Sequence, residues 1–148
     1  MADRFDLVSE IGAAANWLAV VATTRSDGSV HASLVNAGVL DDPVTKRPAV
    51  GIVVSGTARK LEYLRARGRA AVVFHRGWQW VAVEGPVRIA GPDDRAEGIP
   101  PDAVPALLRA VFRSAGGRHD DWDAYDRVMA AERRAAVLIQ PARVTTNA

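Results

Sequence analysis

Segments rich in apolar and β-branched residues recur along the chain and predict a protein built mainly from β-strands. They cover 17–25, 29–40, 49–55, 68–76, 78–91 and 135–144. Their lengths and composition are typical of strands. The Asp27–Gly28 pair and the Arg76–Gly77 pair each stand between two such segments, which predicts two hairpins. The near-continuous apolar run at 49–55 indicates a strand that is buried on both faces.

Helical spacing of apolar residues appears between these segments. It predicts helices over 3–14, from an N-cap at Thr57 or Ser55 to about Arg67, over 102–117 and over 120–134. Six strands joined largely by hairpins favour an antiparallel sheet that closes into a barrel with the helices outside. The expected fold class is therefore α+β, mainly β, in one domain that spans 1–148.

Composition narrows the class of protein. The 148 residues carry 19 basic and 17 acidic side chains, a net charge of +2, which does not favour a nucleic-acid binder. The absence of cysteine excludes disulfides, thiolate zinc sites and cysteine nucleophiles. The sequence contains no apolar run of the roughly 18 residues that a membrane span needs, and its first residues lack the apolar core of a secretion signal. We therefore expect a cytoplasmic protein.

One basic stretch, SGTARKLEYLRARGR at 55–69, suggests a binding site for an anion. Arg65 and Arg67 fall in the last turn of the predicted helix, where positive charge complements the helix dipole. Arg59 and Lys60 fall in the first turn, where the dipole opposes them. A phosphate bound by these two side chains, by the helix amides and by a hydroxyl of Ser55 or Thr57 would resolve that conflict. Two solvated bases on an exposed face are the alternative.

The other chemical motifs give no catalytic residue and no metal site. The chain has no dinucleotide or phosphate-loop glycine pattern, no HExxH and no nucleophile elbow. The three histidines are too scattered to be predicted as metal ligands. Trp78 and Trp80 occupy alternating positions of one predicted strand, so they are expected on one face, where they either fill a core or wall a planar ring. A phosphate site with aromatic walls and no acid–base machinery suits a cofactor that carries its own chemistry.

Three stretches of the chain read LAVVATTRSDGSVHASLVN, GIVVSGTARKLEYLRARGRAAVVF and WVAVEGPVRI. In this order they resemble the pyridoxamine-phosphate-oxidase-like split β-barrel flavoproteins. The later segment HDDWDAYDRVMAAERRAAVLIQPARV is similar to the actinobacterial branch that uses coenzyme F420, the flavin/deazaflavin oxidoreductases of the B type. The resemblance implies an antiparallel six-stranded split β-barrel with flanking helices. It also implies a homodimer with two equivalent cofactor sites between the subunits.

The resemblance assigns nine residues to the cofactor. They are Ser33, Asn36, Val54, Ser55, Thr57, Arg59, Lys60, Gln79 and Trp80. Arg59 and Lys60 match the family's phosphate-binding pair, and Val54 would lay its backbone along the ring. Ser33 and Asn36 stand in the region where the oxidases carry an arginine and a lysine that hold FMN. This departure disfavours FMN and leaves room for a cofactor with a long anionic tail.

The function expected from this resemblance is that of an F420-dependent oxidoreductase. It would transfer a hydride from the reduced deazaflavin to an unsaturated or conjugated small molecule. An FMN-dependent oxidoreductase of the same superfamily is the nearest alternative. A non-enzymatic protein that binds F420, flavin or haem is another, and no side chain is assigned as a catalyst.

Overall fold

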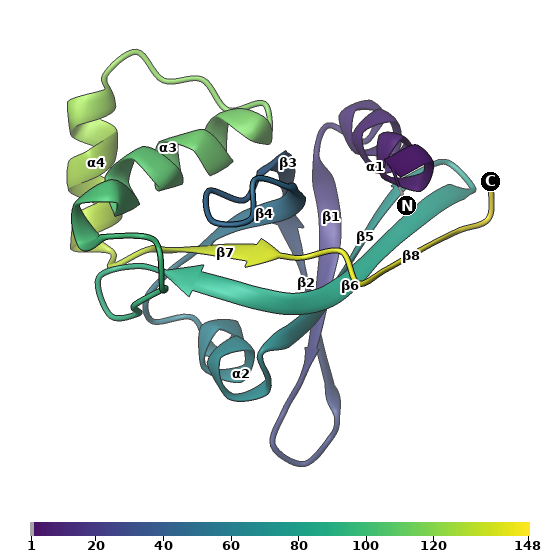
Figure 1. Ribbon diagram of the computed structural model, residues 1–148, viewed down its shortest axis with the longest axis horizontal. Coiled ribbons are helices and arrows are strands. Elements are labelled where there is room, and N and C mark those ends of the chain that lie inside the picture. The colour runs from purple at the N-terminus through teal and green to yellow at the C-terminus, as the bar shows by residue number, and fades with distance from the viewer. Residues whose placement is uncertain (1) are drawn as a thin grey trace.

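Eight antiparallel strands form the body of the protein, with four α-helices around them (Figure 1). The computed structural model describes residues 2–148, with side chains from Arg4 onward. The elements are α1 (Ala2–Ala14), β1 (Leu18–Thr24), β2 (Val30–Asn36), β3 (Gly38–Asp41), β4 (Pro48–Val54), α2 (Arg59–Arg67), β5 (Arg69–Arg76), β6 (Gln79–Ala90), a 3-10 turn (Pro101–Ala103), α3 (Val104–Ser114), α4 (Trp122–Ala131), β7 (Ala135–Ile139) and β8 (Arg143–Thr146). Within residues 2–148, no helix has both the length and the hydropathy that crossing a bilayer requires.

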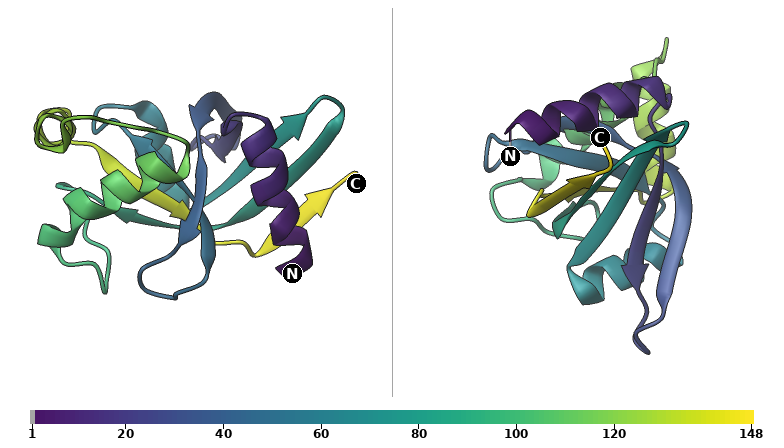
Figure 2. Two further views of the ribbon diagram at one scale, coloured as in Figure 1. Left: turned by 90° about the horizontal axis from the view of Figure 1, so that it is seen from above. Right: turned by 90° about the vertical axis from the view of Figure 1, so that its right-hand side faces the viewer.

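The strand order is β2-β1-β5-β6-β7-β4-β3, and β8 also pairs with β6. The 12-residue strand β6 joins the two halves of the sheet. Its first half lies between β5 and β8, with Val83 opposite both Val72 and Val144, and its second half pairs with β7. Figure 2 shows the strands wrapping around a common interior, with α1 at one end and α3 and α4 at the other. The predicted antiparallel barrel with outer helices is confirmed.

Two of the six predicted strands are each broken in two, so the sheet has eight. The segment 29–40 breaks at Ala37, whose N–H donates to the Trp17 carbonyl, and the chain then continues as β3 against β4. The segment 135–144 breaks at Pro141, which has no N–H to give to a ladder. At this break the chain crosses so close to Gly85 that a Cβ there would lie 1.8 Å from the Gln140 carbonyl oxygen. Both breaks depend on contacts with distant segments.

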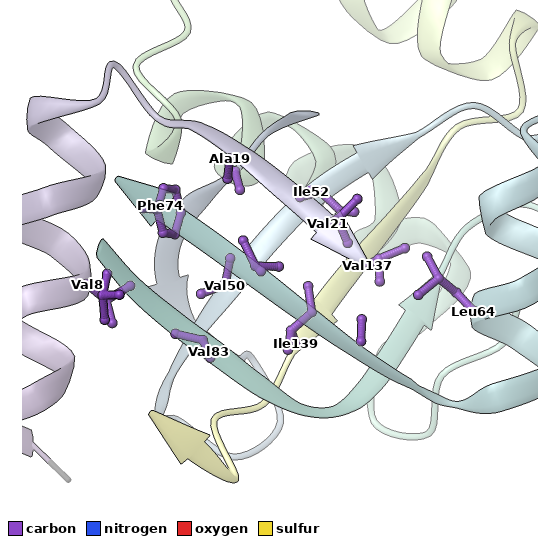
Figure 3. Packing of buried hydrophobic residues seen from close by; sticks show 14 of the residues in the cluster. Val8, Ala19, Val21, Val50, Ile52, Leu64, Phe74, Val83, Val137 and Ile139 are labelled. Carbon is purple, nitrogen blue, oxygen red and sulfur yellow. The ribbon is translucent and has the colours of Figure 1, made fainter. Parts of the chain in front are cut away.

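The interior of the barrel is a continuous apolar core (Figure 3). Phe74, Ile52 and Val83 are fully buried in it, and Val8 of α1 closes one end. A second core lies on the opposite face of β4 and β7, under α3 and α4. Strand β4 therefore contributes to both cores, as the continuous apolar run at 49–55 predicted.

A buried carboxylate fixes the turn between β3 and β4. Asp42 is fully buried and accepts hydrogen bonds from the Val44 and Thr45 amides, from Arg88 and from Gln140. Burial by itself raises the pKa of Asp42, but the hydrogen bonds and the charge of Arg88 outweigh it, so the pKa lies below its ordinary value of 3.8. The carboxylate is therefore a stabilising part of the fold in its ionised form.

Candidate functional site

A cleft of about 690 Å³ lies where β2, β4, α2, α3 and α4 meet. Its lining includes Leu34, Val35 and Asn36 from β2, Val53 from β4, Lys60 from α2, Phe112 with Ala115–Gly117 from the end of α3, and Tyr125, Met129 and Arg134 from the α4 region. Two of the residues predicted to hold the cofactor, Asn36 and Lys60, are brought together here by the fold. We call this space the β2–α3 cleft.

One wall of the β2–α3 cleft is aromatic and apolar. The rings of Phe112 and Tyr125 are stacked, with centroids 5.0 Å apart and planes 11° from parallel. The Tyr125 hydroxyl donates to the Leu108 carbonyl, which fixes its ring. Gly117 packs directly on Phe112, because a Cβ at this glycine would lie 2.2 Å from the ring. Phe112, Tyr125 and Gly117 thus form an apolar wall that is held in place in advance.

Lys60 gives the opposite side of the cleft a positive charge. It is half-buried, and this burial lowers the pKa of its ammonium from the ordinary 10.5. No carboxylate of the described residues forms an ion pair with it. A desolvated cation without a counter-ion is costly in an empty protein and favours the binding of an anion.

The start of α2 is free to bind an anion as well. We predicted Ser55 or Thr57 as the N-cap, and that prediction is wrong: Ala58 occupies the N-cap position and no side chain caps the helix. The two hydroxyls lie 3.3 Å from each other and form a local turn, so neither reaches the helix amides. The backbone N–H groups of Arg59 and Lys60 consequently have no acceptor in residues 2–148. Free amides and cations at a helix start are the elements of an anion site.

The turn between α4 and β7 holds the Ser55–Thr57 loop in place. The Gly56 N–H donates to the Glu132 carbonyl at 3.1 Å, and a Cβ at Gly56 would lie 2.5 Å from the Arg133 carbonyl oxygen. Arg133 has a positive φ of 49° and forms an ion pair with Asp93. The next residue, Arg134, lines the β2–α3 cleft. The sequence analysis missed Arg134, because a base after a helix reads as part of the helix's own electrostatics.

On β2, two buried polar atoms have no hydrogen-bond partner. They are Ser33 Oγ and His31 Nδ1. The His31 ring lies 5.5 Å from that of Tyr63, which stands one helical turn after Lys60 on α2. An unsatisfied buried polar atom costs about 1–3 kcal/mol, so these atoms indicate a place for a ligand or water between β2 and α2. Ser33 is one of the residues predicted to contact the cofactor, and His31 is not.

The remaining predicted residues lie elsewhere. Val54 points into the barrel core and pairs with Ala135 of β7, and its neighbour Val53 lines the cleft instead. Gln79 and Trp80 begin β6, and Figure 1 shows the β5–β6 turn at the end of the protein away from α2, α3 and α4. The prediction that Trp78 and Trp80 share one strand face is wrong. It sits in the two-residue turn and is 91% exposed.

The chemistry of the cleft is that of binding rather than proton transfer. Its ionisable side chains are Lys60, Tyr125 and Arg134, and burial raises the pKa of the Tyr125 hydroxyl above its ordinary value of 10.0. None of the three is a histidine or a carboxylate, the side chains that act most often as general acids and bases. An apolar aromatic wall in the same cleft as a cation at an amide-rich helix start suits an apolar ring that bears an anionic chain.

No protein-family model matches the chain. Several solved structures are similar to it in fold. An FMN-binding protein related to pyridoxamine 5'-phosphate oxidase from Nostoc punctiforme has a TM-score of 0.68 at 12% identity, covering 99% of this chain and 84% of its own. An F420 reductase has a TM-score of 0.61 at 14% identity, covering 90% and 94%. A heme binding protein from Mycobacterium smegmatis has a TM-score of 0.63 at 19% identity, covering 93% and 51%.

These likenesses establish the fold. The chain has the split β-barrel fold of the pyridoxamine 5'-phosphate oxidase-like proteins, which the sequence resemblance predicted.

Proposed function

We propose that the protein is an F420-dependent oxidoreductase that transfers a hydride from the reduced deazaflavin to an unsaturated or conjugated small molecule. The observation that carries the proposal is Lys60, a partly buried cation without a carboxylate partner among the described residues, in the same cleft as the stacked Phe112 and Tyr125 rings. The split-barrel fold and the resemblance of the sequence to F420-using proteins support it.

The residues of the cleft fit such a cofactor. The phosphate would be bound by Lys60, by the exposed Arg59 and by the amide N–H groups at the start of α2. The hydroxyls of Ser55 and Thr57 would lie beside it. The stacked wall would lie along the ring system, and the unpartnered Ser33 Oγ and the amide of Asn36 would hydrogen-bond to polar atoms of the ring or its side chain.

When bound, the cofactor supplies the hydride. The protein then contributes orientation and exclusion of water. The proton that completes reduction of the substrate would come from solvent or from a hydroxyl, because none of the described residues that line the cleft is a histidine or a carboxylate.

F420 is preferred to FMN because of the charge at the site. Lys60 lines the cleft and Arg59 lies at the same helix start, and neither forms an ion pair with a carboxylate of the described residues. Arg134 also lines the cleft, where it is paired with Glu132 at 2.7 Å. Two unpaired cations and the helix amides suit a cofactor whose anionic chain is longer than a single phosphate monoester. The test is to titrate the purified protein with F420 and with FMN, following the absorbance of each, and then to assay reduction of enones, quinones and nitroaromatics. We expect F420 to bind at least tenfold more tightly and to support turnover. Tight FMN binding without F420 binding would show an FMN oxidoreductase instead, and tight binding without any turnover would show a cofactor carrier.

The proposal includes a homodimer. On the outer face of β1 and β2, the side chains of Leu18, Val20, Val30 and Leu34 are 44%, 40%, 61% and 67% exposed. This apolar face borders the cleft, because Leu34 belongs to both. A second copy of the chain that covers this face would close the cleft, and its β5–β6 hairpin could then bring Gln79 and Trp80 to the neighbour's cofactor. Such exposed apolar patches mark interaction surfaces.

Light scattering after size exclusion tests the dimer. The 15.8 kDa chain should elute with twice that mass. Val20→Glu on the proposed interface should produce monomers, whereas Val128→Glu, at an apolar residue of α4 that is 49% exposed, should leave the dimer intact. A monomeric wild type would exclude the arrangement.

A further inference from the structure

A second and larger cleft lies away from the anion site. It has a volume of about 890 Å³ and is formed by the segment 91–101, the start of α3 and one face of α4. We call it the proline cleft, because four of its lining residues are prolines: Pro92, Pro100, Pro101 and Pro105. Its size falls in the range of sites that hold small organic ligands, about 300–1,000 Å³.

The proline cleft is formed by structure that is fixed in the absence of a ligand. The segment 91–101 is folded on itself by two isolated β-bridges, Gly91 with Asp94 and Ala96 with Ile99. Asp94 is bound by both Nε and a terminal nitrogen of Arg65 from α2, each at 2.7 Å. Proline rings further limit the freedom of the backbone. A ligand would therefore not have to order this loop when it binds.

The lining of the cleft defines the class of ligand. Its floor is apolar and consists of Ile99, Val104, Leu108 and Met129. The acids that line it are Asp94, Asp126 and Glu97, and the first two are neutralised by Arg65 and Arg109, which reach them from outside the lining. Arg95 is exposed at the rim, and no acid of the described residues forms an ion pair with it. The apolar floor and the aliphatic proline rings favour apolar molecules, and the unpaired Arg95 favours a single anionic group.

We propose that the proline cleft is a binding site for an apolar small molecule that carries at most one anionic group. The proposal does not depend on the identity of the cofactor. The two clefts are nevertheless neighbours, because Met129 and Arg134 line both of them. A molecule in the proline cleft would lie one side chain away from the β2–α3 cleft.

The test uses 1-anilinonaphthalene-8-sulfonate, a planar apolar probe with one anionic group, and the δ1-methyl NMR signals of the five isoleucines. Ile99 lines the proline cleft, whereas the other four lie outside both clefts. Its signal is assigned from its loss in Ile99→Val. We expect saturable binding of one probe per chain, with a ring-current shift that is large for the Ile99 methyl and small for the others.

A matched pair of variants on α4 locates the probe. Ala130 lines the proline cleft and its neighbour Ala131 does not, and both are exposed on the helix. Ala130→Phe should fill the cleft and weaken probe binding at least tenfold, whereas Ala131→Phe should leave it unchanged. Binding that perturbs other isoleucines and spares Ile99, or that is equal in both variants, would overturn the proposal. If Ala130→Phe does not fold, the Ile99 shift in the wild type decides by itself.

Discussion

Replacing Lys60 with methionine should weaken the binding of an anionic cofactor and at the same time stabilise the ligand-free protein. Methionine keeps the unbranched apolar stem and removes the ammonium. The opposite signs follow from the same fact: the cation is desolvated in the fold, and no carboxylate compensates for its burial. An ordinary surface lysine would show neither effect.

The effect on binding can be estimated from one lost charge-assisted hydrogen bond. Such a bond contributes about 1.5–3 kcal/mol, which corresponds to a roughly 10- to 150-fold weaker Kd. The loss should fall on the phosphate. Riboflavin, which is FMN without its phosphate, should therefore bind the variant and the wild type equally.

The effect on stability has a definite dependence on pH. The folded-state pKa of Lys60 is lowered from 10.5, so the charged side chain destabilises the fold throughout the neutral range. Between the lowered pKa and 10.5 the unfolded chain binds more protons than the folded one, and the stability of the wild type rises with pH there. The variant should lack this rise and be more stable at pH 7 by about 0.5 kcal/mol, since the group keeps part of its solvent.

Two assays measure these effects. Urea unfolding of the ligand-free protein at pH 7 and pH 10 gives the change in stability, and titration with FMN and riboflavin gives the change in affinity. Lys46→Met is the matched control, because Lys46 is the chain's other lysine and is exposed in the β3–β4 turn. A Lys60→Met protein that is less stable than the wild type and retains its preference for FMN over riboflavin would refute the reasoning. In that case Lys60 would serve the fold rather than the ligand.

Three further predictions concern the loop, the wall and the fold. Gly56→Ala should cost about 1–3 kcal/mol and weaken cofactor binding, because its Cβ would meet the Arg133 carbonyl. Gly28→Ala, at a glycine with open space around it but a φ of 86°, should lose stability and keep the affinity; equal affinities in the two variants would contradict this. Phe112→Leu should weaken the binding of riboflavin and of FMN equally, since it removes an aromatic contact and no charge. Titration with both ligands measures this, and a loss of affinity confined to FMN would show that Phe112 does not contact the ring system. Asp42 has a folded-state pKa below 3.8, so it should stabilise the protein above that pH and progressively less below it. Asp42→Asn should lower the free energy of unfolding by about 1.5–3 kcal/mol at pH 7 and weaken its fall at acid pH in a series of urea-unfolding experiments. An unchanged dependence on acid pH would exclude this role.

The sequence by itself determined the local elements and the class of fold. The turn glycines placed both hairpins, and the continuous apolar run at 49–55 marked the strand that lies between two cores. Helical spacing placed Leu61 and Leu64 in the buried stripe of α2, and Gly68 ends that helix with a φ of 67°. These features are predictable because they depend on residues that are near one another in the chain. Lys60 could be proposed as an anion-binding residue for the same reason, since its conflict with the helix dipole is local.

The tertiary structure decided what depends on distant segments. The breaks at Ala37 and Pro141 follow from a bond to Trp17 and from a crossing over Gly85, and no local pattern records either partner. The β2–α3 cleft exists because α3 and α4 pack beside β2, which places the aromatic wall opposite Lys60 and adds Arg134. Whether a polar atom is satisfied, as for His31, is likewise a property of its neighbours in space. The sequence thus indicated Lys60 as a candidate for anion binding, and only the packing of the helices on the sheet formed the cleft around it.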